Sequence, residues 1–156
     1  MITNESIENF LSGHRLAVVG ASDEKSNFGG AIYRALRDHG YEPVAVNPNA
    51  TSVAGDPCYP DLPSVPGAVD GVVVMVGRSA AVDVVRTAIE QGIRRVWLFK
   101  GLGAPGSVSE EAVALCRRAG VEVVEGACPM MFLEPVGWFH RLHRSMRHVN
   151  HSLEPA

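Results

Sequence analysis

Long hydrophobic runs, an excess of basic residues and an export signal are all missing from this 156-residue chain. No polar-free run approaches the length needed to cross a bilayer, so we expect no membrane insertion. The formal net charge of −3 provides no overall attraction to nucleic acid or to anionic lipid. The N-terminus is polar where a secretory signal would be basic and then apolar, which predicts that the protein is not exported.

Cysteine is also scarce. The three thiols are odd in number and widely spaced, at Cys58, Cys116 and Cys128, which argues against a disulfide framework and fits a reducing, cytoplasmic location. The chain is 46% hydrophobic, enough for one well-buried core, and is too short for a nucleotide domain plus a separate catalytic domain. We therefore expect a single domain over residues 1–156, with its core at about 7–131.

What the chain does have is a repeated pattern in which a helical segment, a glycine and an apolar β-rich run follow one another. Gly40, Gly92 and Gly120 stand between the helical segment and the run, as expected for left-handed residues that end helices. The runs predict strands near 16–20, 43–47, 71–76, 95–100 and 121–124. This alternation favours an α/β fold, a doubly wound Rossmann-like domain with a five-stranded, mostly parallel sheet.

Three other segments carry local predictions. Ser107 and Glu110 have the spacing of a capping box, which predicts a helix over about 107–119. Residues 48–70 contain five prolines, a density that excludes a regular helix or central strand and suggests a surface connection with one helical turn at 61–65. Residues 135–149 have apolar positions at helical spacing, which predicts an amphipathic C-terminal helix that packs on the body or on a partner subunit.

The run Leu16–Gly20 breaks into a polar loop that leads to Gly29 and Gly30 and then to a helix. Glycine lets backbone N–H groups approach a pyrophosphate, and the following helix presents its unpaired N–H groups to the same anion. The glycine spacing differs from that of the dinucleotide fingerprint. The second strand also ends in Asn47 and Pro48, where an NAD site usually has an acidic residue on the ribose. We therefore expect a phosphate loop that is not shaped for NAD.

Glycine follows four of the five predicted strands. Ligands of open α/β sheets bind beyond the carboxyl ends of the strands, which we call the strand exits, so this pattern favours an extended ligand that lies across all five exits. The order of these pieces over residues 7–131 resembles the small stand-alone CoA-binding proteins, a Rossmann-like family similar to the N-terminal CoA-binding domain of the succinyl-CoA synthetase alpha subunit. The resemblance is carried by Val18–Ser22, Gly40-Tyr41, Val46–Pro48, Cys58–Leu62 with Pro66, Val96–Leu98, and Gly120–Val124 running to Cys128-Pro129.

The resemblance implies coenzyme A as the ligand, in three parts. The diphosphate would lie on the loop Ser22–Gly30, with Ser22, Asn27, Phe28 and Gly29 nearest, and Gly20 and Ala21 before this loop would belong to the binding residues as well. The adenine and 3′-phosphoribose would lie beside Asn47, Pro48, Gly77 and Arg78, with Arg78 in place of a lysine that the synthetase domain has after its proline. The pantetheine arm would run past Lys100 and Gly101 toward Cys128. The synthetase domain with the phosphorylated histidine has no counterpart here, so we expect no ligase activity.

Three functions from different classes stay open at this point. The favoured one binds CoA or an acyl-CoA without catalysis, and the second is an NAD(P)-linked oxidoreductase or redox sensor. The third is an acyl-CoA-processing enzyme that uses Cys128 or a histidine of the C-terminal segment, although a reactive thiol would need a lowered pKa. We expect no metal site, because arginines crowd the same face as the histidines of that segment.

Overall fold

The computed structural model describes residues 3–100 and 106–133. Its centre is a sheet of seven strands in the order β3-β4-β2-β1-β5-β6-β7. All neighbouring strands are parallel except β3 and β4. The strands are β1 (Arg15–Val19), β2 (Glu42–Val46), β3 (Ser52–Val53), β4 (Asp56–Tyr59), β5 (Gly71–Val74), β6 (Arg95–Leu98) and β7 (Glu122–Glu125).

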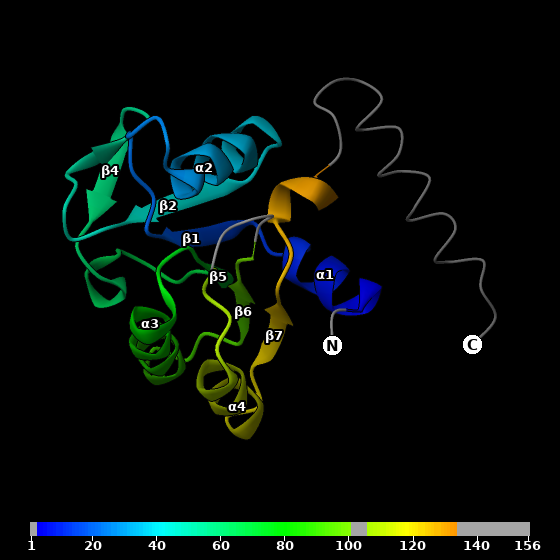
Figure 1. Cartoon of the computed structure of the whole chain (residues 1–156). Helices are drawn as coiled ribbons and strands as arrows, with labels where there is room; N and C mark the ends of the chain where they lie inside the picture. The colour runs from blue at the N-terminus through cyan, green and yellow to red at the C-terminus, as the bar shows by residue number, and fades with distance from the viewer. Residues whose placement is uncertain (1–2, 101–105, 134–156) are drawn as a thin grey trace, which may run out of the picture.

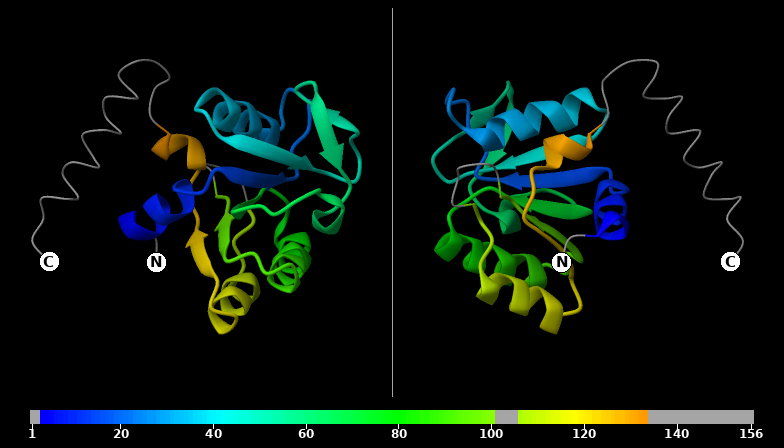
Figure 2. Two further views of the ribbon diagram at one scale, coloured as in Figure 1. Left: turned by 180° about the vertical axis from the view of Figure 1, so that it is seen from behind. Right: turned by 45° about the vertical axis from the view of Figure 1, so that its right-hand side comes forward.

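Helices cover both faces of this sheet. Figure 1 shows α2 on one side and α3 and α4 on the other, and the two views in Figure 2 agree. The α1 helix packs against β6 and β7. Two 3₁₀ turns, η1 and η2, follow β4 and β7. The elements are α1 (Asn4–Leu11), α2 (Phe28–Asp38), α3 (Arg78–Glu90), α4 (Glu110–Arg118), η1 (Leu62–Ser64) and η2 (Pro129–Phe132). The fold is therefore the doubly wound, Rossmann-like architecture that the sequence predicts.

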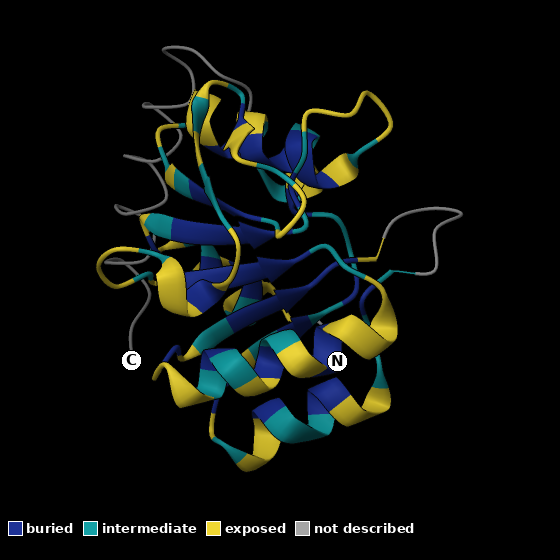
Figure 3. Cartoon of the chain, turned by 90° about the vertical axis from the view of Figure 1, so that its left-hand side faces the viewer, coloured by how far each residue is buried: buried dark blue, intermediate teal, exposed yellow. Residues whose placement is uncertain are grey.

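The strand β5 explains why the central runs are apolar without alternation. Its side chains are fully buried, and they alternate between two hydrophobic clusters, one on each face of the sheet. Val72 and Val74 pack with α3 and α4, whereas Val73 packs with residues of α1 and α2. Figure 3 shows the same division, with buried strands between helices whose outer faces are exposed. Both faces of a parallel sheet must be covered, and each valine buried in this way contributes about 1.5 kcal/mol or more.

The helix ends follow the glycine pattern. Gly40, Gly92 and Gly120 have φ values of 85°, 76° and 70°, in the left-handed region where a side chain is disfavoured. All five predicted strands are present, although β5 and β6 each end two residues earlier than the sequence suggests.

The prediction of five strands is wrong, because the proline-rich segment contains β3 and β4. These strands form a hairpin, and β4 pairs with β2 through Cys58 and Tyr59. The ladder to β2 uses only residues that follow Pro57, so the N–H that this proline lacks is not needed there. The helical turn expected in the segment is present as η1, where the Asp61 side chain accepts from the Ser64 amide.

The capping box at Ser107 is also wrong. The α4 helix begins at Glu110, and its N-cap is Ser109, whose hydroxyl accepts from the Ala112 amide at 3.0 Å. Ser107 is instead buried, and its hydroxyl donates to the Val76 carbonyl oxygen after β5. The predicted C-terminal helix at 135–149 lies outside the described residues. Within the described part of the chain, no helix is long and apolar enough to span a membrane.

Candidate functional site

The carboxyl ends of the parallel strands meet at one edge of the sheet and are joined there by backbone hydrogen bonds. The Gly20 amide donates to Val46, and the Met75 amide donates to Val19. On the other side of β5, the Phe99 amide donates to Val74. The chain winds in opposite directions from β1 and β5, so the topological switch point lies between these two strands. Ligands of open α/β sheets bind at such a point, beyond the carboxyl ends.

The loop between β1 and α2 is fixed by one side chain, that of Asn27. Its Oδ1 atom accepts from the Gly30 amide at 2.7 Å and from the Ser22 amide at 3.2 Å. Its Nδ2 atom donates to the Gly20 carbonyl oxygen at 3.2 Å. Asn27 is thus the N-cap of α2 and also ties both ends of the loop together. The sequence predicts Asn27 as a ligand residue, and its bracing role is visible only in the structure.

The glycines that open α2 are required by the loop itself. A Cβ atom on Gly29 would lie 2.8 Å from the Gly20 carbonyl oxygen, and one on Gly30 would lie 2.0 Å from the Ser22 carbonyl oxygen. Gly20 has a φ of 101°, which a side chain rarely adopts. We expected glycine here to leave space for a pyrophosphate. The structure gives a second reason, which is the close packing of the loop against the first turn of α2.

Asn47, at the end of β2, braces the same loop from the other side. Its Nδ2 atom donates to the carbonyl oxygen of buried Ala21 at 3.0 Å, and its Oδ1 atom accepts from the Asn49 amide at 2.9 Å. Both polar ends of the side chain are therefore used within the protein. Pro48 follows and is exposed. The structure thus brings the side chain of Asn47 against the loop between β1 and α2.

The turn after β5 is more open. Gly77 is the N-cap of α3 with no side-chain cap, and a Cβ atom placed on it would contact nothing within 4 Å. Arg78, the first residue of α3, is exposed. The hydrogen bond from Ser107 to Val76 holds this turn to the segment before α4. This supporting role of Ser107 could not be predicted from the sequence, because its spacing to Glu110 indicates a helix cap instead.

The exits of β6 and β7 lie side by side. The Lys100 amide donates to the Ala127 carbonyl oxygen at 3.1 Å, and Ala127 has a left-handed φ of 75°. Phe28, which is 60% exposed, stacks on buried Phe99 with ring centroids 6.1 Å apart, so an aromatic contact joins the start of α2 to the exit of β6. The thiol of half-buried Cys128 has no hydrogen bond to another side chain among the described residues. Gly101 lies outside the described residues.

Positive charge is unpaired at these exits. Both lysines of the chain, Lys25 and Lys100, and Arg78 are exposed and have no ion-pair partner within residues 3–100 and 106–133. Five other arginines pair with a carboxylate, namely Arg15, Arg34, Arg37, Arg86 and Arg117. Arg94, Arg95 and Arg118 have no carboxylate partner among the described residues, and they lie in other loops, strands and helices. The first turns of α2 and α3 contain no acidic residue, unlike those of α1 and α4. Both helix N-termini therefore offer free N–H groups and a positive dipole end to an anion.

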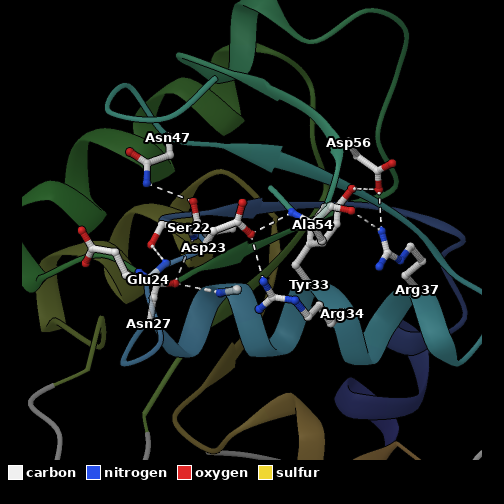
Figure 4. Close-up of polar contacts among 12 residues, drawn as sticks. Ser22, Asp23, Glu24, Asn27, Tyr33, Arg34, Arg37, Asn47, Ala54 and Asp56 are labelled. Atoms are coloured by element: carbon white, nitrogen blue, oxygen red, sulfur yellow. Dashed lines mark hydrogen bonds and ion pairs between the residues drawn. The ribbon is translucent and has the colours of Figure 1, made fainter. Parts of the chain in front are cut away.

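A polar cluster attaches the β3–β4 hairpin to α2, as Figure 4 shows. The Tyr33 hydroxyl donates to Asp56 Oδ2 at 2.7 Å, and Arg37 donates to the same oxygen at 3.1 Å. These two donors lower the pKa of the Asp56 carboxyl. Burial, together with the hydrogen bond to Asp56, raises the pKa of Tyr33, and burial also raises the pKa of Cys58. The pKa shifts of Asp56, Tyr33 and Cys58 all point away from neutral pH, which favours a structural role for these three side chains.

Neither a metal site nor the groove along α4 coincides with the strand exits in the described part of the chain. Among the described residues, no group of three or more His, Cys, Asp or Glu side chains could hold a metal ion. A surface groove runs along α4 and contains none of the residues of the β1, β2 or β5 exits. The ion pair between Arg117 and Glu125, at 3.2 Å, belongs to its lining. We therefore place the candidate site at the strand exits.

The chain is similar to known proteins in sequence. It is 31% identical over 118 residues to an ADP-forming acetate–CoA ligase I of Archaeoglobus fulgidus, an alignment that covers 72% of this chain and 17% of the ligase. It is 29% identical over 114 residues to the uncharacterized protein YneT of Bacillus subtilis, covering 73% of this chain and 81% of that protein. The chain thus spans a small part of the ligase and most of the short relative.

Solved structures show the same two kinds of relative. A hypothetical protein from Pyrococcus horikoshii matches with a TM-score of 0.76 and 28% identity, covering 83% of this chain and 89% of that one. The dinucleotide-forming acetyl-coenzyme A synthetase 1 of Ca. Korarchaeum cryptofilum matches with a TM-score of 0.60 and 29% identity, covering 70% of this chain and 25% of that one. Finally, residues 14–134, which include all the strand exits described above, match the sequence model of the CoA binding domain, and the chain belongs to this family.

Proposed function

We propose that this protein binds coenzyme A, free or as an acyl-CoA, across the carboxyl ends of its parallel strands and catalyses no reaction of its own. The observation that carries the proposal is the family match over residues 14–134, which includes every loop of the candidate site. The free N-termini of α2 and α3, on either side of the switch point between β1 and β5, support it physically. Both can interact with phosphate groups of one extended ligand.

In this proposal the diphosphate lies over the first turn of α2. The amides of Phe28 and Gly29 are the free donors there, because the Asn27 side chain already occupies the Gly30 amide. Lys25 supplies a nearby positive charge. Asn27 and Asn47 act through the backbone that they hold, and Ser22 and Ala21 contribute main-chain surface.

The adenosine end then lies at the exits of β2 and β5, beside Pro48, Gly77 and Arg78. The open space at Gly77 supports a 3′-phosphate contact there, as does the guanidinium of Arg78, which has no ion-pair partner among the residues that the structure describes. The pantetheine arm passes the Phe28–Phe99 ring pair and Lys100 on its way to Cys128. In the part of the chain that the structure describes, no base or cation contacts the Cys128 thiol, so we give Cys128 a binding role and no chemistry.

The first experiment is mass spectrometry of the natively purified protein under conditions that keep ligands bound. The proposal predicts a bound species with the mass of CoA or of an acyl-CoA, which is released on denaturation. A protein that retains NAD or NADP instead, or that fails to bind added CoA in solution, would contradict it.

A further inference from the structure

Asp23 lies in the loop between β1 and α2, one residue after Ser22. Its Oδ1 atom accepts two hydrogen bonds, from the Ala54 amide at 2.8 Å and from the Arg34 guanidinium at 2.9 Å. One carboxylate oxygen therefore joins the loop, the α2 helix and the β3–β4 hairpin. Figure 4 shows this oxygen between Ala54 and Arg34.

The hairpin turn that Asp23 holds is strained. Ala54 and Gly55 are the two residues of the turn between β3 and β4, and their φ values are 52° and 83°. A turn with two left-handed residues matches the twist of a hairpin but favours Asn, Asp or Gly at its first position. Alanine is present there, and charged side chains hold both of its backbone polar groups. Asp23 accepts from the amide, and Arg37 donates to the carbonyl oxygen at 2.9 Å.

Electrostatics alone would disfavour an acidic residue in this loop. Asp23 and Glu24 are adjacent carboxylates beside the proposed diphosphate site, and both would repel an anionic ligand. Asp23 is paired with Arg34, whereas the Glu24 carboxylate has no partner among the described residues and points away from the cluster in Figure 4. The two residues share their charge and neighbourhood but not their contacts.

We propose that Asp23 is a positioning residue for the CoA diphosphate. Its carboxylate holds the strained hairpin turn against the loop, so that the backbone after Ser22 is kept in the conformation that binds the ligand. This inference rests on the proposed function. It adds that the β3–β4 hairpin, which has no ligand residue of its own, contributes to affinity through Asp23. Because coupling is reciprocal, bound CoA stabilises the contact between Asp23 and Ala54 in turn.

The test compares Asp23→Ala, Asp23→Asn and Glu24→Gln by calorimetric titration with CoA. If the loop adopts its binding conformation in only about a tenth of the molecules without Asp23, the dissociation constant rises about tenfold. Asparagine keeps an oxygen for the Ala54 amide but loses the charge toward Arg34, so we expect a smaller loss for Asp23→Asn. Glu24→Gln removes the same charge without breaking a contact and should bind CoA at least as tightly as the wild type.

Whether Asp23→Ala raises or lowers the dissociation constant for CoA decides whether the Asp23 carboxylate positions the loop or only repels the ligand. An unchanged or tighter dissociation constant for this variant would overturn the inference, because it would mean that the carboxylate acts only as a negative charge. A wild-type protein that does not bind CoA would overturn the proposed function as well. A wild type that binds, next to variants that bind equally well, would overturn the inference alone.

Two further measurements separate positioning from a general loss of stability. Arg34→Gln removes the other side of the ion pair and should also weaken CoA binding, whereas Arg86→Gln breaks the exposed pair with Glu111 on α4 and should not. Hydrogen exchange at the Ala54 amide should slow when CoA is added to the wild type. Exchange that is unchanged by CoA would contradict the coupling between the hairpin and the ligand.

Discussion

The loop after β1 and the turn after β5 lie on the two sides of the same switch point, yet they are built differently. Asn27, Asn47 and Asp23 fix the loop after β1 by hydrogen bonds to its backbone or to its neighbours. The turn after β5 has no side-chain cap, an exposed arginine and space around Gly77. Its described side-chain support is the Ser107 hydroxyl on Val76.

This difference fits the two ends of the proposed ligand. A diphosphate is bound by backbone N–H groups that must already point at one place, so a rigid loop binds it with little ordering cost. The adenosine end is bound by a long arginine side chain, which can adapt to its phosphate, so the backbone below needs less support. If this contrast between a rigid loop and an open turn holds, substitutions in the two segments have different effects on folding and on binding.

The largest effect should come from adding one methyl group to the rigid loop. In Gly30→Ala the new Cβ would lie 2.0 Å from the Ser22 carbonyl oxygen, so the loop must move, and we expect a loss of about 3 kcal/mol in the free energy of unfolding. The matched control is Gly77→Ala, whose Cβ meets nothing within 4 Å, with an expected change of about 0.5 kcal/mol or less. Denaturant unfolding measures both. Similar losses in the two variants would contradict the contrast.

Arg78→Ala should affect binding and leave folding unchanged. If Arg78 pairs with the 3′-phosphate, the variant loses about 1.5–3 kcal/mol of binding free energy toward CoA, the range for hydrogen bonds to charged groups. The loss should be much smaller toward 3′-dephospho-CoA. Titration with both ligands checks this, and equal losses would show that Arg78 does not contact the 3′-phosphate.

Asn27→Ala removes the cap of α2 and the two other hydrogen bonds that close the loop. We expect a loss of about 1–2 kcal/mol in the free energy of unfolding, together with weaker CoA binding. Asn27→Asp is the control, because its carboxylate can still accept from the Gly30 and Ser22 amides. If the Asn27→Ala variant is less stable but binds CoA with unchanged affinity, CoA binding does not depend on the hydrogen bonds of the Asn27 side chain.

The smallest effect should be an increase in stability, in the variant Ala54→Gly. Ala54→Gly places glycine at a left-handed position while keeping the backbone groups that Asp23 and Arg37 bind, and we expect about 0.5–1 kcal/mol of added stability. Thermal unfolding measures it, with Ala50→Gly, at a position with no left-handed φ, as the control. A destabilised Ala54→Gly variant would mean that the turn is not strained in the way we describe.

Sequence patterns predicted the parts of the fold that depend on short-range signals. The glycines that end helices and the apolar runs of β1 and β5 are local features, and the structure confirms them. The pairing of β4 with β2 is not local, since proline density in the segment hides two short strands whose partners lie elsewhere in the chain. Ser107 was misassigned for a related reason, because a capping pattern cannot show that a serine is buried against Val76.

For the candidate site, sequence spacing located the loops but not how they are held. The sequence predicts Asn27 and Asn47 as ligand residues, but it cannot show that both side chains hold backbone groups of one loop. Asp23 was overlooked because its partners, Arg34 and Ala54, are eleven and thirty-one residues away. Contacts of this kind arise from the packing of α2 and the hairpin, which no local motif encodes.

Calorimetric titration of the purified wild-type protein with CoA, NAD, NADP and ATP under one set of conditions tests the central claim most directly. We predict that CoA binds most tightly, because the loop lacks the dinucleotide spacing and Asn47 stands where an acidic residue would bind the NAD ribose. Tighter binding of NAD than of CoA would contradict the account.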